Sequence, residues 1–372
     1  MNVLIIPGDG IGSEVTRAAV KVLRATGLPL EFGEAEAGWG AFQCTGAALP
    51  EATLAAARAA DAILFGAVAS PSHPVTGYKS PIVGLRRALD LYANIRPVYD
   101  FGFTIDDSRT QALSSIQNPK SKIVNLVVVR ENTEGLYAGR ERVEDNGDTA
   151  ITERVITRRA SERIVRAAFE LARARGQEQD SGSQASGSRP QAPKVTLVHK
   201  ANVLRETCGL FRRVGLEVAA EYPDVHCDEL LVDTAALQLV QRPERFDVIV
   251  TTNLFGDILS DIACYWGGGM GMATSANIGG QHALFEPVHG AAPDIAGHGI
   301  ANPLAAIGCA AMLLEHLGTR GQGPGIRDQY EEAARRIRKA VRRVVVEGPH
   351  PPDLGGAART KDVTAAVISA IR

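Results

Sequence analysis

The sequence predicts an α/β protein, and three observations support this fold class. Short apolar segments typical of buried strands recur along the chain, at 2–6, 61–66, 123–129, 194–199 and 246–252. Most of these segments are followed by small or polar residues and then by apolar residues at helical spacing. The length of 372 residues is enough for one large α/β domain or two smaller ones. Strands that alternate with helices indicate a partly parallel sheet covered by helices.

The first predicted strand, at 2–6, leads into a glycine-rich turn at 7–12, after which Ser13 is a candidate cap for a helix. This turn reads GDGIGS from Gly8, whereas the dinucleotide fingerprint is G-x-G-x-x-G. Because the sixth position is serine, we predict a tight strand-to-helix turn and no classical Rossmann motif. An alanine-rich helix is then expected near 51–60, directly before the second strand.

Three segments are expected to be loops. Residues 104–122 are polar and interrupt an otherwise ordered pattern. Residues 176–193 are rich in Gly, Ser and Gln, which predicts a mobile surface loop between a helix and a strand. Residues 318–328 contain several glycines and a proline, which indicates a turn between two C-terminal helices.

Charge and composition exclude several classes of protein. The chain has 40 basic and 42 acidic residues, so no basic excess draws the whole molecule to nucleic acid or to a membrane surface. No apolar run approaches the ~20 residues that span a bilayer, and the run at 3–6 is too short for a signal peptide. The five cysteines form no C-x-x-C pair, which favours reduced thiols in a cytoplasmic protein over a disulfide framework or a zinc site.

Three aspartates are candidate metal ligands. Asp257 and Asp261 are four residues apart after a predicted strand, so a helix would place both carboxylates on one face. A divalent cation with oxygen ligands would relieve their repulsion, but two exposed aspartates near a helix N-terminus are an equally good interpretation. Asp233 lies in the apolar stretch LLVDTAA, where a carboxylate needs a partner such as a metal ion.

Basic side chains gather at 86–96 and also stand at the ends of two predicted strands, at Arg130 and Lys200. Arg86, Arg96 and Arg130 suit bidentate pairing with the carboxylates of an anionic substrate, although ordinary ion pairing explains any single arginine better. Only eight of the 40 basic residues are lysines, and Lys200 directly follows the predicted strand at 194–199. Lysine can act as a proton acceptor, whereas arginine effectively cannot.

The sequence alone does not decide whether Tyr137 and the segment 285–302 have a structural or a chemical role. Tyr137 is either an ordinary packed aromatic side chain or a proton donor. The segment 285–302 has glycines and small residues around His289, which suits a loop wrapped around a ligand or a long surface loop. An acidic residue there, such as Asp294, could accept hydrogen bonds from a ribose diol and repel a 2′-phosphate.

Six of these segments resemble, in the same order, the motifs of one enzyme family: PGDGIG, LRRALDLYANIRP, RENTEGLY, HKANV, TTNLFGDILSD and EPVHGAAPDIAGHGIANP. The chain is similar to the metal-dependent β-decarboxylating dehydrogenases of 2-hydroxy acids, which act on isocitrate, 3-isopropylmalate, homoisocitrate or tartrate. The resemblance covers essentially the whole chain. The departures are longer loops at 104–122 and 176–193, and His298 where a lysine is usual, so no catalytic position is affected.

The resemblance implies an isocitrate/isopropylmalate dehydrogenase-like fold, with two domains around a shared sheet and no classical Rossmann fold. Residues 1–98 and 271–372 would form a large, discontinuous cofactor-binding domain. Residues 99–270 would form a dimerisation and substrate domain that carries the two mobile insertions. The active sites would be shared across a subunit interface, so we expect a homo-oligomer, either a dimer or a dimer of dimers, that binds a small tricarboxylate.

The resemblance also implies roles for individual residues. Mg²⁺ or Mn²⁺ would be bound by Asp257 and Asp261 of one subunit and by Asp233 of the other. Lys200, which would also cross the interface, would accept the hydroxyl proton, and Tyr137 would protonate the carbon that loses CO₂. The substrate-binding residues would be Ser70, Ser80, Val83, Arg86, Arg96, Arg130, Tyr137, Lys200 and Asn202. The cofactor-binding residues would be Asn202, His289, Gly290, Ala291, Ala292, Pro293, Asp294, Ile295 and Asn302.

The resemblance implies NAD as the cofactor and homoisocitrate as the substrate. Asp294 and Ile295 match NAD users, because NADP users in the family carry a lysine and a tyrosine there. The segment 77–86, with Ser80 and the apolar Val83, is similar to that of enzymes that convert homoisocitrate to 2-oxoadipate in lysine biosynthesis. Isocitrate and 3-isopropylmalate are the alternative substrates, since one methylene changes discrimination by only ~1–3 kcal/mol. A non-catalytic regulatory subunit of an isocitrate dehydrogenase is a further alternative. It is less favoured, because such a subunit would not need the intact catalytic and metal-binding side chains.

Overall fold

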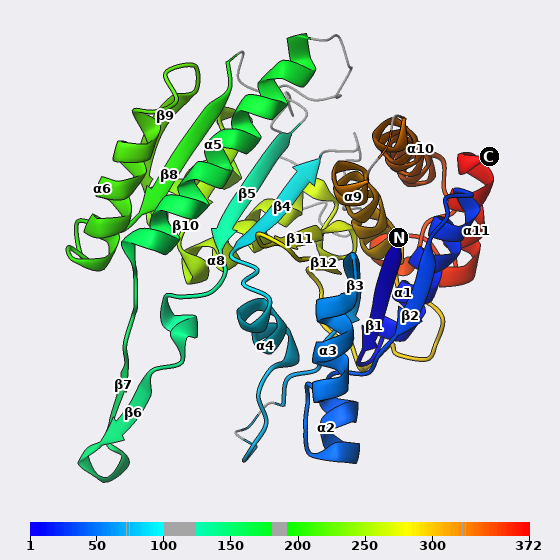
Figure 1. The fold of residues 1–372 in the computed structure, drawn as a ribbon, viewed down its shortest axis with the longest axis horizontal. Helices are drawn as coiled ribbons and strands as arrows, with labels where there is room; N and C mark the ends of the chain where they lie inside the picture. Colours follow the sequence, from blue (N-terminus) through cyan, green and yellow to red (C-terminus); the bar gives the residue numbers. More distant parts are fainter. Residues whose placement is uncertain (72, 74, 100–123, 181–191, 322, 324) are drawn as a thin grey trace, which may run out of the picture. The chain divides into compact units, whose positions relative to one another are not determined.

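The computed structural model describes residues 1–71, 73, 75–99, 124–180, 192–321, 323 and 325–372. Contacts between Cα atoms divide these residues into two compact units, which are Met1–Leu91 with Gly269–Arg372, and Tyr92–Gly268. Figure 1 labels the helices and strands of both units along the chain. The predicted loop at 104–122 lies outside the described residues.

The first unit contains a five-stranded arrangement in the order β2-β1-β3-β12-β11. The strands are β1 (Asn2–Gly8), β2 (Glu31–Glu34), β3 (Ala62–Ala67), β11 (Thr274–Ile278) and β12 (Ala283–Pro287). All pairs are parallel except β11 with β12, and the register places Val3 opposite Ala62. Every residue of β3 is buried, as expected for a parallel strand that is covered on both faces.

Helices cover both faces of these strands. They are α1 (Gly12–Ala25), α2 (Trp39–Thr45), α3 (Glu51–Ala59), α4 (Pro81–Ala88), α9 (Leu304–Arg320), α10 (Ile326–Glu347) and α11 (Thr360–Ile371). Helix α9 contacts β3, β11 and β12, and α1 packs against α9 and α11. A separate apolar cluster joins Leu4 and Ile6 of β1 to Leu85 of α4. Leu4 and Ile6 are two positions apart along β1, so both face this cluster.

The second unit has its own strand order, β4-β5-β10-β8-β9. The strands are β4 (Ala93–Tyr99), β5 (Asn125–Glu131), β8 (Lys194–His199), β9 (His226–Leu231) and β10 (Val248–Thr251). Only the β4–β5 pair is antiparallel among these pairs. As a result, the C-terminal ends of β5, β8 and β10 lie at one edge, and a helix follows two of them at that edge.

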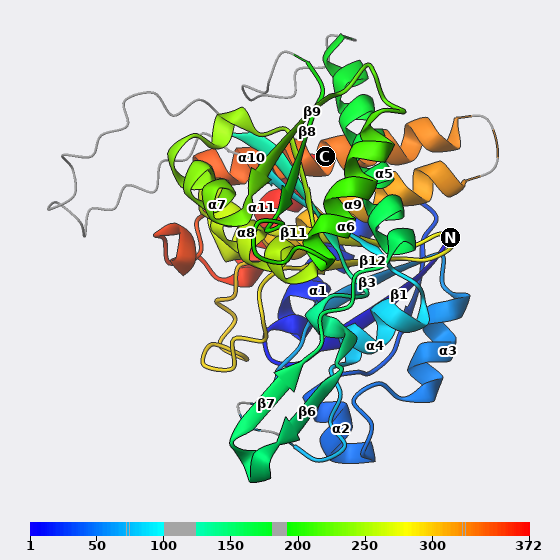
Figure 2. The same cartoon turned by 90° about the vertical axis from the view of Figure 1, so that its left-hand side faces the viewer.

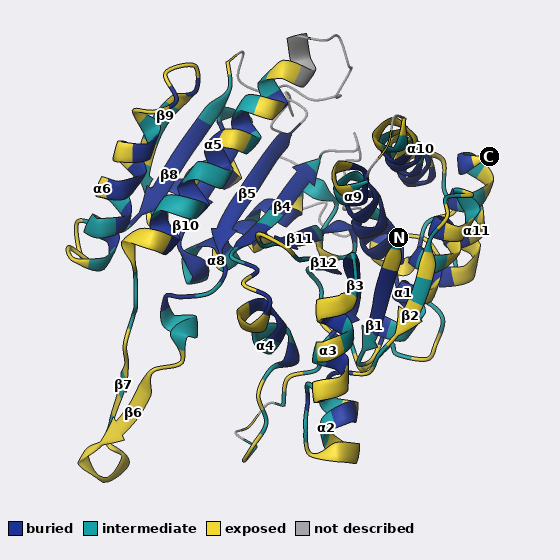
Figure 3. Ribbon diagram, in the orientation of Figure 1, coloured by how far each residue is buried: buried dark blue, intermediate teal, exposed yellow. Residues whose placement is uncertain are grey.

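The helices of this unit are α5 (Arg158–Asp180), α6 (Thr207–Ala219), α7 (Val232–Gln241) and α8 (Asn253–Cys264). Helices α7 and α8 bury Leu239 and Leu259 with Leu126 of β5 in one core, whereas α5 contacts β5, β8 and β10. Among the strands that the structure describes, β6 (Glu141–Glu144) and β7 (Thr149–Thr152) pair with each other alone, as a short antiparallel ribbon. Figures 1 and 2 show this ribbon extending away from the strands of the unit, and Figure 3 shows that it is largely exposed.

The predicted α/β class is confirmed, and two local predictions are corrected. Ser13 does not cap α1, because the helix already begins at Gly12, with Ile11 at the cap position. A side chain at Gly12 would place its Cβ 2.1 Å from the Pro7 carbonyl oxygen, so glycine permits this tight entry. Helix α5 continues to Asp180 although the sequence predicted a loop from 176, because the segment there is rich in Gln and Glu, which favour helix. Residues 181–191 of that predicted loop lie outside the described residues.

The predicted turn near 318–328 is present between α9 and α10, with residues 322 and 324 outside the description. None of the helices that the structure describes combines the length and the apolar character needed to cross a bilayer.

Candidate active site

Five of the predicted site residues lie together in the second unit. Arg96 comes from β4, Arg130 from the end of β5, Tyr137 from the short 3₁₀ helix η1 (Leu136–Ala138), and Asp257 and Asp261 from α8. We call these five residues the α8 cluster. The antiparallel pairing of β4 with β5 sets Asn94 opposite Arg130, and this register brings the two arginines to α8.

Ion pairs connect the arginines and aspartates of the α8 cluster. Arg130 Nη1 donates to Asp257 Oδ1, and Arg96 Nη2 lies 3.3 Å from the same oxygen. Arg96 Nη1 also lies 3.4 Å from Asp261 Oδ1. The side chain of Arg130 is only 2% exposed, so its charge must be compensated by nearby carboxylates or amides. Removing one partner of such a buried pair typically costs about 3–5 kcal/mol.

Tyr137 is positioned to hold a proton beside these charges. Its hydroxyl donates to Asp257 Oδ2 at 2.9 Å, and its ring centroid lies 5.3 Å from the Arg130 guanidinium carbon. Burial is the main cause that raises the pKa of Tyr137, the negative charge of Asp257 raises it further, and Arg130 opposes both. The hydroxyl is therefore protonated at neutral pH, as a proton donor must be.

The Asp261 carboxyl responds to the same surroundings. Burial raises its pKa above the ordinary value, the positive charge of Arg96 lowers it, and the neighbouring Asp257 carboxylate raises it again. Asp257 and Asp261 thus form a like-charged pair on one face of α8, held together by Arg96.

The donor chemistry of the α8 cluster fits Mg²⁺ or Mn²⁺, because hard cations prefer carboxylate oxygens. Two carboxylates are too few for a closed site, and no group of three or more His, Cys, Asp or Glu side chains placed to bind a metal occurs within the described residues. Any such site therefore needs a further ligand from elsewhere, such as a substrate, water or a second subunit.

Lys200 and Asp233 form a separate pair in the same unit. Lys200 follows β8, Asp233 lies in the first turn of α7, and Lys200 Nζ donates to Asp233 Oδ1 at 2.6 Å. This hydrogen bond is the main cause that lowers the pKa of Asp233. The sequence interpretation of Asp233 as a carboxylate among apolar side chains is wrong in this chain, because its side chain is 63% exposed. The helix start turns it toward solvent while Ala235 faces the core.

The residues next to Lys200 show how the turn after β8 is held. The buried His199 accepts the Ala201 backbone N–H at Nδ1 over 3.2 Å. Burial is also the main cause that lowers the pKa of His199, so its ring is neutral at pH 7. Asn202, predicted to contact both substrate and nicotinamide, is exposed on the same turn.

In the first unit, the predicted substrate segment is held by an aromatic group. The Tyr78 hydroxyl donates to the Ala69 carbonyl oxygen at 3.0 Å, and its ring packs against Trp39 and Phe42. Asp9 accepts the Ala69 N–H at 2.9 Å. It also accepts the backbone N–H groups of residues 39 and 40, so its carboxylate organises the loop before the exposed Ser70 and is not free for a ligand.

The other predicted substrate residues of this unit lie on or next to α4. Ser80 precedes the helix, and Val83 is partly buried in its first turn. Arg86 is buried and donates from Nη2 to Glu286 Oε1 at 2.8 Å, while Asn277 donates to the same carboxylate oxygen. The Arg86 Nε atom is buried without a hydrogen-bond partner in the described residues, so the guanidinium keeps unused donor capacity.

The predicted cofactor loop, residues 289–302, is held mainly through its backbone. Ile11 N–H donates to the Ala291 carbonyl at 2.9 Å, and Gly297 N–H donates to Glu14 Oε1 at 2.6 Å. A Cβ at Gly10 would lie 2.0 Å from the Ala291 oxygen, so glycine is required for this close approach. Of the other predicted residues, Gly290, Pro293 and Asp294 are exposed, whereas Ala292 and Ile295 are partly buried.

Two polar side chains lie at the ends of this loop, of which Asn302 is buried and His289 is partly buried. Asn302 donates to Asp353 Oδ2 at 3.0 Å and accepts the Leu304 N–H at 2.9 Å, which fixes the start of α9. His289 places Nδ1 3.0 Å from the Gly290 carbonyl oxygen, and its Nε2 has no partner among the described residues. Burial lowers the pKa of His289, which keeps the ring neutral.

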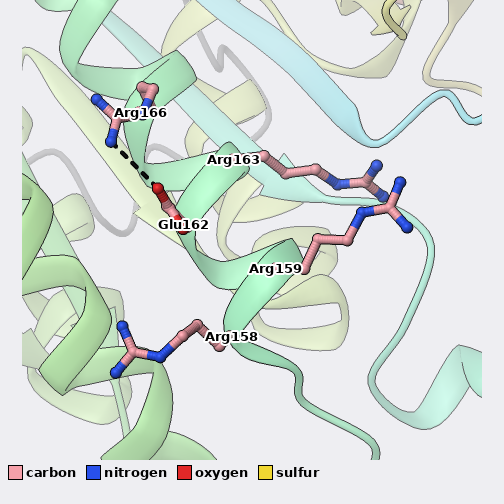
Figure 4. A pocket seen from close by; sticks show the side chains of 5 residues that line it. All are labelled: Arg158, Arg159, Glu162, Arg163 and Arg166. Carbon is pink, nitrogen blue, oxygen red and sulfur yellow. Dashed lines mark hydrogen bonds and ion pairs between the residues drawn. The ribbon is translucent and has the colours of Figure 1, made fainter.

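An open pocket on α5 contains none of the predicted residues. It is lined by Arg158, Arg159, Glu162, Arg163 and Arg166 (Figure 4). Arg158 pairs with Glu217 of α6, and Arg166 pairs with Glu221 in the turn that follows this helix. These ion pairs assign the two arginines to the packing of α5 on α6.

Sequence reasoning missed two residues that organise the α8 cluster. Asn253, at the start of α8, accepts hydrogen bonds from Arg130, and Glu134 accepts the N–H and hydroxyl of Thr157 and so closes the loop before Tyr137. The position of Asn253 directly after a buried strand was the available signal, because polar residues at strand ends in parallel sheets face ligand crevices.

Comparisons with known proteins show the family of the chain. The isocitrate/isopropylmalate dehydrogenase family matches residues 2–367. Isocitrate/homoisocitrate dehydrogenase of Thermus thermophilus is 49% identical, and homoisocitrate dehydrogenase of Methanocaldococcus jannaschii is 46% identical. Both matches cover 100% of this chain and 98% of the relative. The crystal structure of isocitrate dehydrogenase from Methylococcus capsulatus is 43% identical, with a TM-score of 0.84 over 100% of this chain and 99% of that one.

The chain belongs to the isocitrate/isopropylmalate dehydrogenase family, and the predicted family fold is confirmed. It is an enzyme of the decarboxylating dehydrogenase class, which oxidises and decarboxylates a hydroxy acid. Members of this family generally use a divalent metal with NAD or NADP, and they are typically oligomers that act on small substrates.

Proposed function

We propose that the chain oxidatively decarboxylates homoisocitrate to 2-oxoadipate and CO₂, with NAD⁺ as the hydride acceptor. The α8 cluster carries the reaction class, because it brings a protonated phenol, two carboxylate-binding arginines and two carboxylates together. The choice of homoisocitrate is supported by the names of the two relatives and by Ser80 and Val83 in the segment 77–86.

The arginines and the metal ligands would prepare the substrate. Arg86, Arg96 and Arg130 would each bind a substrate carboxylate, for which guanidinium groups provide paired donors. Asp257 and Asp261 would hold Mg²⁺ or Mn²⁺, and Asp233 of a second copy would supply the further ligand. When bound, the cation would ease loss of the hydroxyl proton and stabilise the enolate formed as CO₂ departs.

Two side chains would move protons. Lys200 Nζ would accept the proton of the substrate hydroxyl, directly or through a water, as the hydride leaves the carbon that carries this hydroxyl for NAD⁺. Tyr137 would then donate its hydroxyl proton to the carbon that lost CO₂. The hydrogen bond from Tyr137 to Asp257 keeps this hydroxyl at the α8 cluster before the reaction.

NAD is the proposed cofactor, because the exposed Asp294 would accept hydrogen bonds from a ribose diol and repel the extra phosphate of NADP. We assign cofactor binding to the predicted domain 1–98 with 271–372. Substrate binding and dimerisation are assigned to the predicted domain 99–270.

A second copy of the chain is the proposed partner. Leu237 and Val240 of α7 and Ile258 of α8 are large apolar side chains that are more than half exposed. Apolar side chains gathered on adjacent helices are typical of an interface between subunits. A dimer through this face would also bring Asp233 and Lys200, on and beside α7, to the second subunit. Sedimentation should therefore show a dimer or a dimer of dimers.

Isocitrate is the second candidate substrate, because the Thermus relative is named for both acids. The test is Mg²⁺-dependent NAD⁺ reduction by the purified chain with homoisocitrate, isocitrate and 3-isopropylmalate in parallel. The highest kcat/KM on homoisocitrate would support the proposal. A preference for either other acid would keep the mechanism and replace the substrate, whereas inactivity on all three would refute the proposed function.

A further inference from the structure

We propose that Asn253 is the positioning residue of the active site, because one side chain fixes both Arg130 and the loop that carries Tyr137. The inference rests on the proposed function, in which Arg130 binds a substrate carboxylate and Tyr137 donates a proton. Asn253 itself would not touch the reacting atoms. It would act through the two residues that do.

The hydrogen bonds of Asn253 point in two directions. Its Oδ1 accepts from Arg130 Nε at 3.1 Å and from Arg130 Nη2 at 2.7 Å. Its Nδ2 donates to the Glu134 backbone carbonyl oxygen at 3.2 Å. The orientation of the amide is determined by its partners, because a guanidinium can only donate and a carbonyl can only accept. Asn253 is 1% exposed, so water cannot easily replace either partner.

The loop that Asn253 holds is already closed by hydrogen bonds of its own. The Glu131 carboxylate accepts the backbone N–H groups of Thr133 and Glu134 at 2.9 and 3.0 Å. The Glu134 carboxylate accepts the N–H and the hydroxyl of Thr157. The segment from 131 to 134 is therefore a compact body, and the Asn253 bond attaches it to α8 only a few residues before Tyr137.

Arg130 is fitted closely to the beginning of α8. A Cβ at Gly256 would lie 2.6 Å from Arg130 Cγ, so glycine leaves room for the aliphatic part of the arginine along the helix. Asn253 then holds the Nε and Nη2 edge of the guanidinium, and Asp257 binds Nη1. The start of α8 thus determines both the place and the rotation of the Arg130 guanidinium.

An amide suits this position better than a carboxylate or an apolar side chain. Asparagine accepts from Arg130 without adding a second negative charge to that of the Asp257 carboxylate that already pairs with it. Aspartate would add a competing negative charge and would lose the donor to the Glu134 carbonyl. An apolar residue would remove the acceptor of two hydrogen bonds from the buried Arg130, which is unfavourable.

The test compares Asn253→Ala and Asn253→Asp with Thr252→Val, with and without Arg130→Lys. Thr252 is the matched control, because it is the adjacent buried polar residue and its hydroxyl accepts from Arg154, an arginine outside the α8 cluster. The readouts are KM and kcat for the acid that wild type oxidises fastest, together with the thermal unfolding midpoint of each variant.

We expect Asn253→Ala to raise KM about tenfold and to lower kcat as well, since a hydrogen bond to a charged group is lost. Thr252→Val should lower the unfolding midpoint, because it loses the hydrogen bond from Arg154. It should not change KM or kcat more than about twofold, because that bond does not involve the α8 cluster. In the Arg130→Lys background, Asn253→Ala should add little to KM, because residues that act through one another are not additive.

Each outcome decides the inference. Additive effects of Asn253→Ala and Arg130→Lys, or equal kinetic effects of Thr252→Val, would show that Asn253 merely supports the fold. If Asn253→Ala fails to fold, Asn253→Asp takes its place, because the aspartate keeps acceptors for Arg130. It should still raise KM, because its negative charge competes with the substrate carboxylate for Arg130. An unchanged KM in Asn253→Asp would overturn the inference. A normal KM in Arg130→Lys alone, or no activity of wild type on any of the three acids, would instead overturn the proposed function and this inference with it.

Discussion

The α8 cluster and the loop at 289–302 are positioned by different means. In the cluster, charged side chains hold one another, as Arg96, Arg130 and Asp257 show. In the loop, backbone groups make the main contacts, such as the Ala291 carbonyl with Ile11 and the Gly297 N–H with Glu14. The cluster is thus compensated before any ligand binds, whereas the loop leaves side chains such as Asp294 exposed.

This difference follows from the cost of burying charge. A guanidinium as buried as Arg130 is tolerated only if carboxylates and amides satisfy it, so the α8 cluster must exist as a complete network. Backbone anchoring imposes no such condition on the side chains of the loop. Substitutions in the cluster should therefore affect stability and catalysis together, whereas substitutions in the loop should change ligand preference alone.

Asp257→Asn should have the largest effect. The single amide oxygen can replace only one of the two carboxylate oxygens that accept from Arg130 and from Tyr137. The side chain also lacks the negative charge that pairs with two arginines and would bind a divalent cation. Loss of several kcal/mol of transition-state stabilisation corresponds to a fall in kcat/KM of about 10³-fold. The measurement is kcat/KM over a range of Mg²⁺ concentrations after treatment with a chelator. Near-normal activity at low Mg²⁺ would contradict the metal assignment.

Tyr137→Phe should have the next largest effect and should divide the reaction. General acid catalysis contributes about 10²–10⁴-fold, so loss of the phenol proton should slow the decarboxylation and protonation half by at least about 10²-fold. Hydride transfer should fall less, because the Arg130 and Asp257 pair remains. Single-turnover NADH formation and CO₂ release, measured separately, test this division. Equal slowing of both signals would assign Tyr137 a role in substrate orientation instead.

Much of the fold was predictable from the sequence because it depends on neighbouring residues. The strands β3 and β8 follow apolar runs, and α8 was expected from the spacing after β10. Strand β4 was missed, since its sequence ANIRPVY places Arg96 and a proline among apolar residues. Arg96 can lie in a buried strand because distant residues compensate it: Ser260, 164 residues away in the chain, accepts a hydrogen bond from its Nη1, and Asp257 and Asp261 pair with its charge. Local patterns carry no signal for such a partner.

The candidate site was predictable as residue types but not as a network. Arg130, Asp257 and Tyr137 were singled out by position, yet their contacts join residues that are 120 or more positions apart. Asn253 received no role, because an asparagine at the start of a helix is common for reasons of capping alone. The exposure of Asp233 was also unexpected, since apolar neighbours in sequence do not show which side of a helix faces solvent.

Asp294→Asn is the counterpart of Asp257→Asn in the loop and should have a smaller, more selective effect. Removing the exposed charge should lower the preference for NAD⁺ over NADP⁺ by about tenfold, which corresponds to ~1.4 kcal/mol. The unfolding midpoint should stay unchanged, because no ion pair of Asp294 holds the loop among the described contacts. Measured kcat/KM for both cofactors provides the ratio. A large loss of stability would remove the contrast between the two regions.

The smallest effect should come from a partly buried group that has no compensating charge among the residues that the structure describes. His316 of α9 packs near Phe285, its Nε2 has no partner among the described residues, and burial lowers its pKa to about 4. The unfolded chain, with an ordinary histidine pKa near 6.5, binds more protons than the folded chain as pH falls below 6.5. Stability should therefore fall with pH in the window from about 6.5 to 4.

His316→Leu isolates this contribution, because the other histidines titrate in both proteins. Between pH 7 and 5.5, wild type should lose about 1 kcal/mol more of its free energy of unfolding than the variant, as the pKa difference requires. Denaturant unfolding at several pH values gives the comparison. If the free energy of unfolding depended on pH in the same way in both proteins, His316 would be protonated in the folded state as readily as in the unfolded chain. An acidic side chain would then have to compensate it, as the carboxylates compensate Arg130.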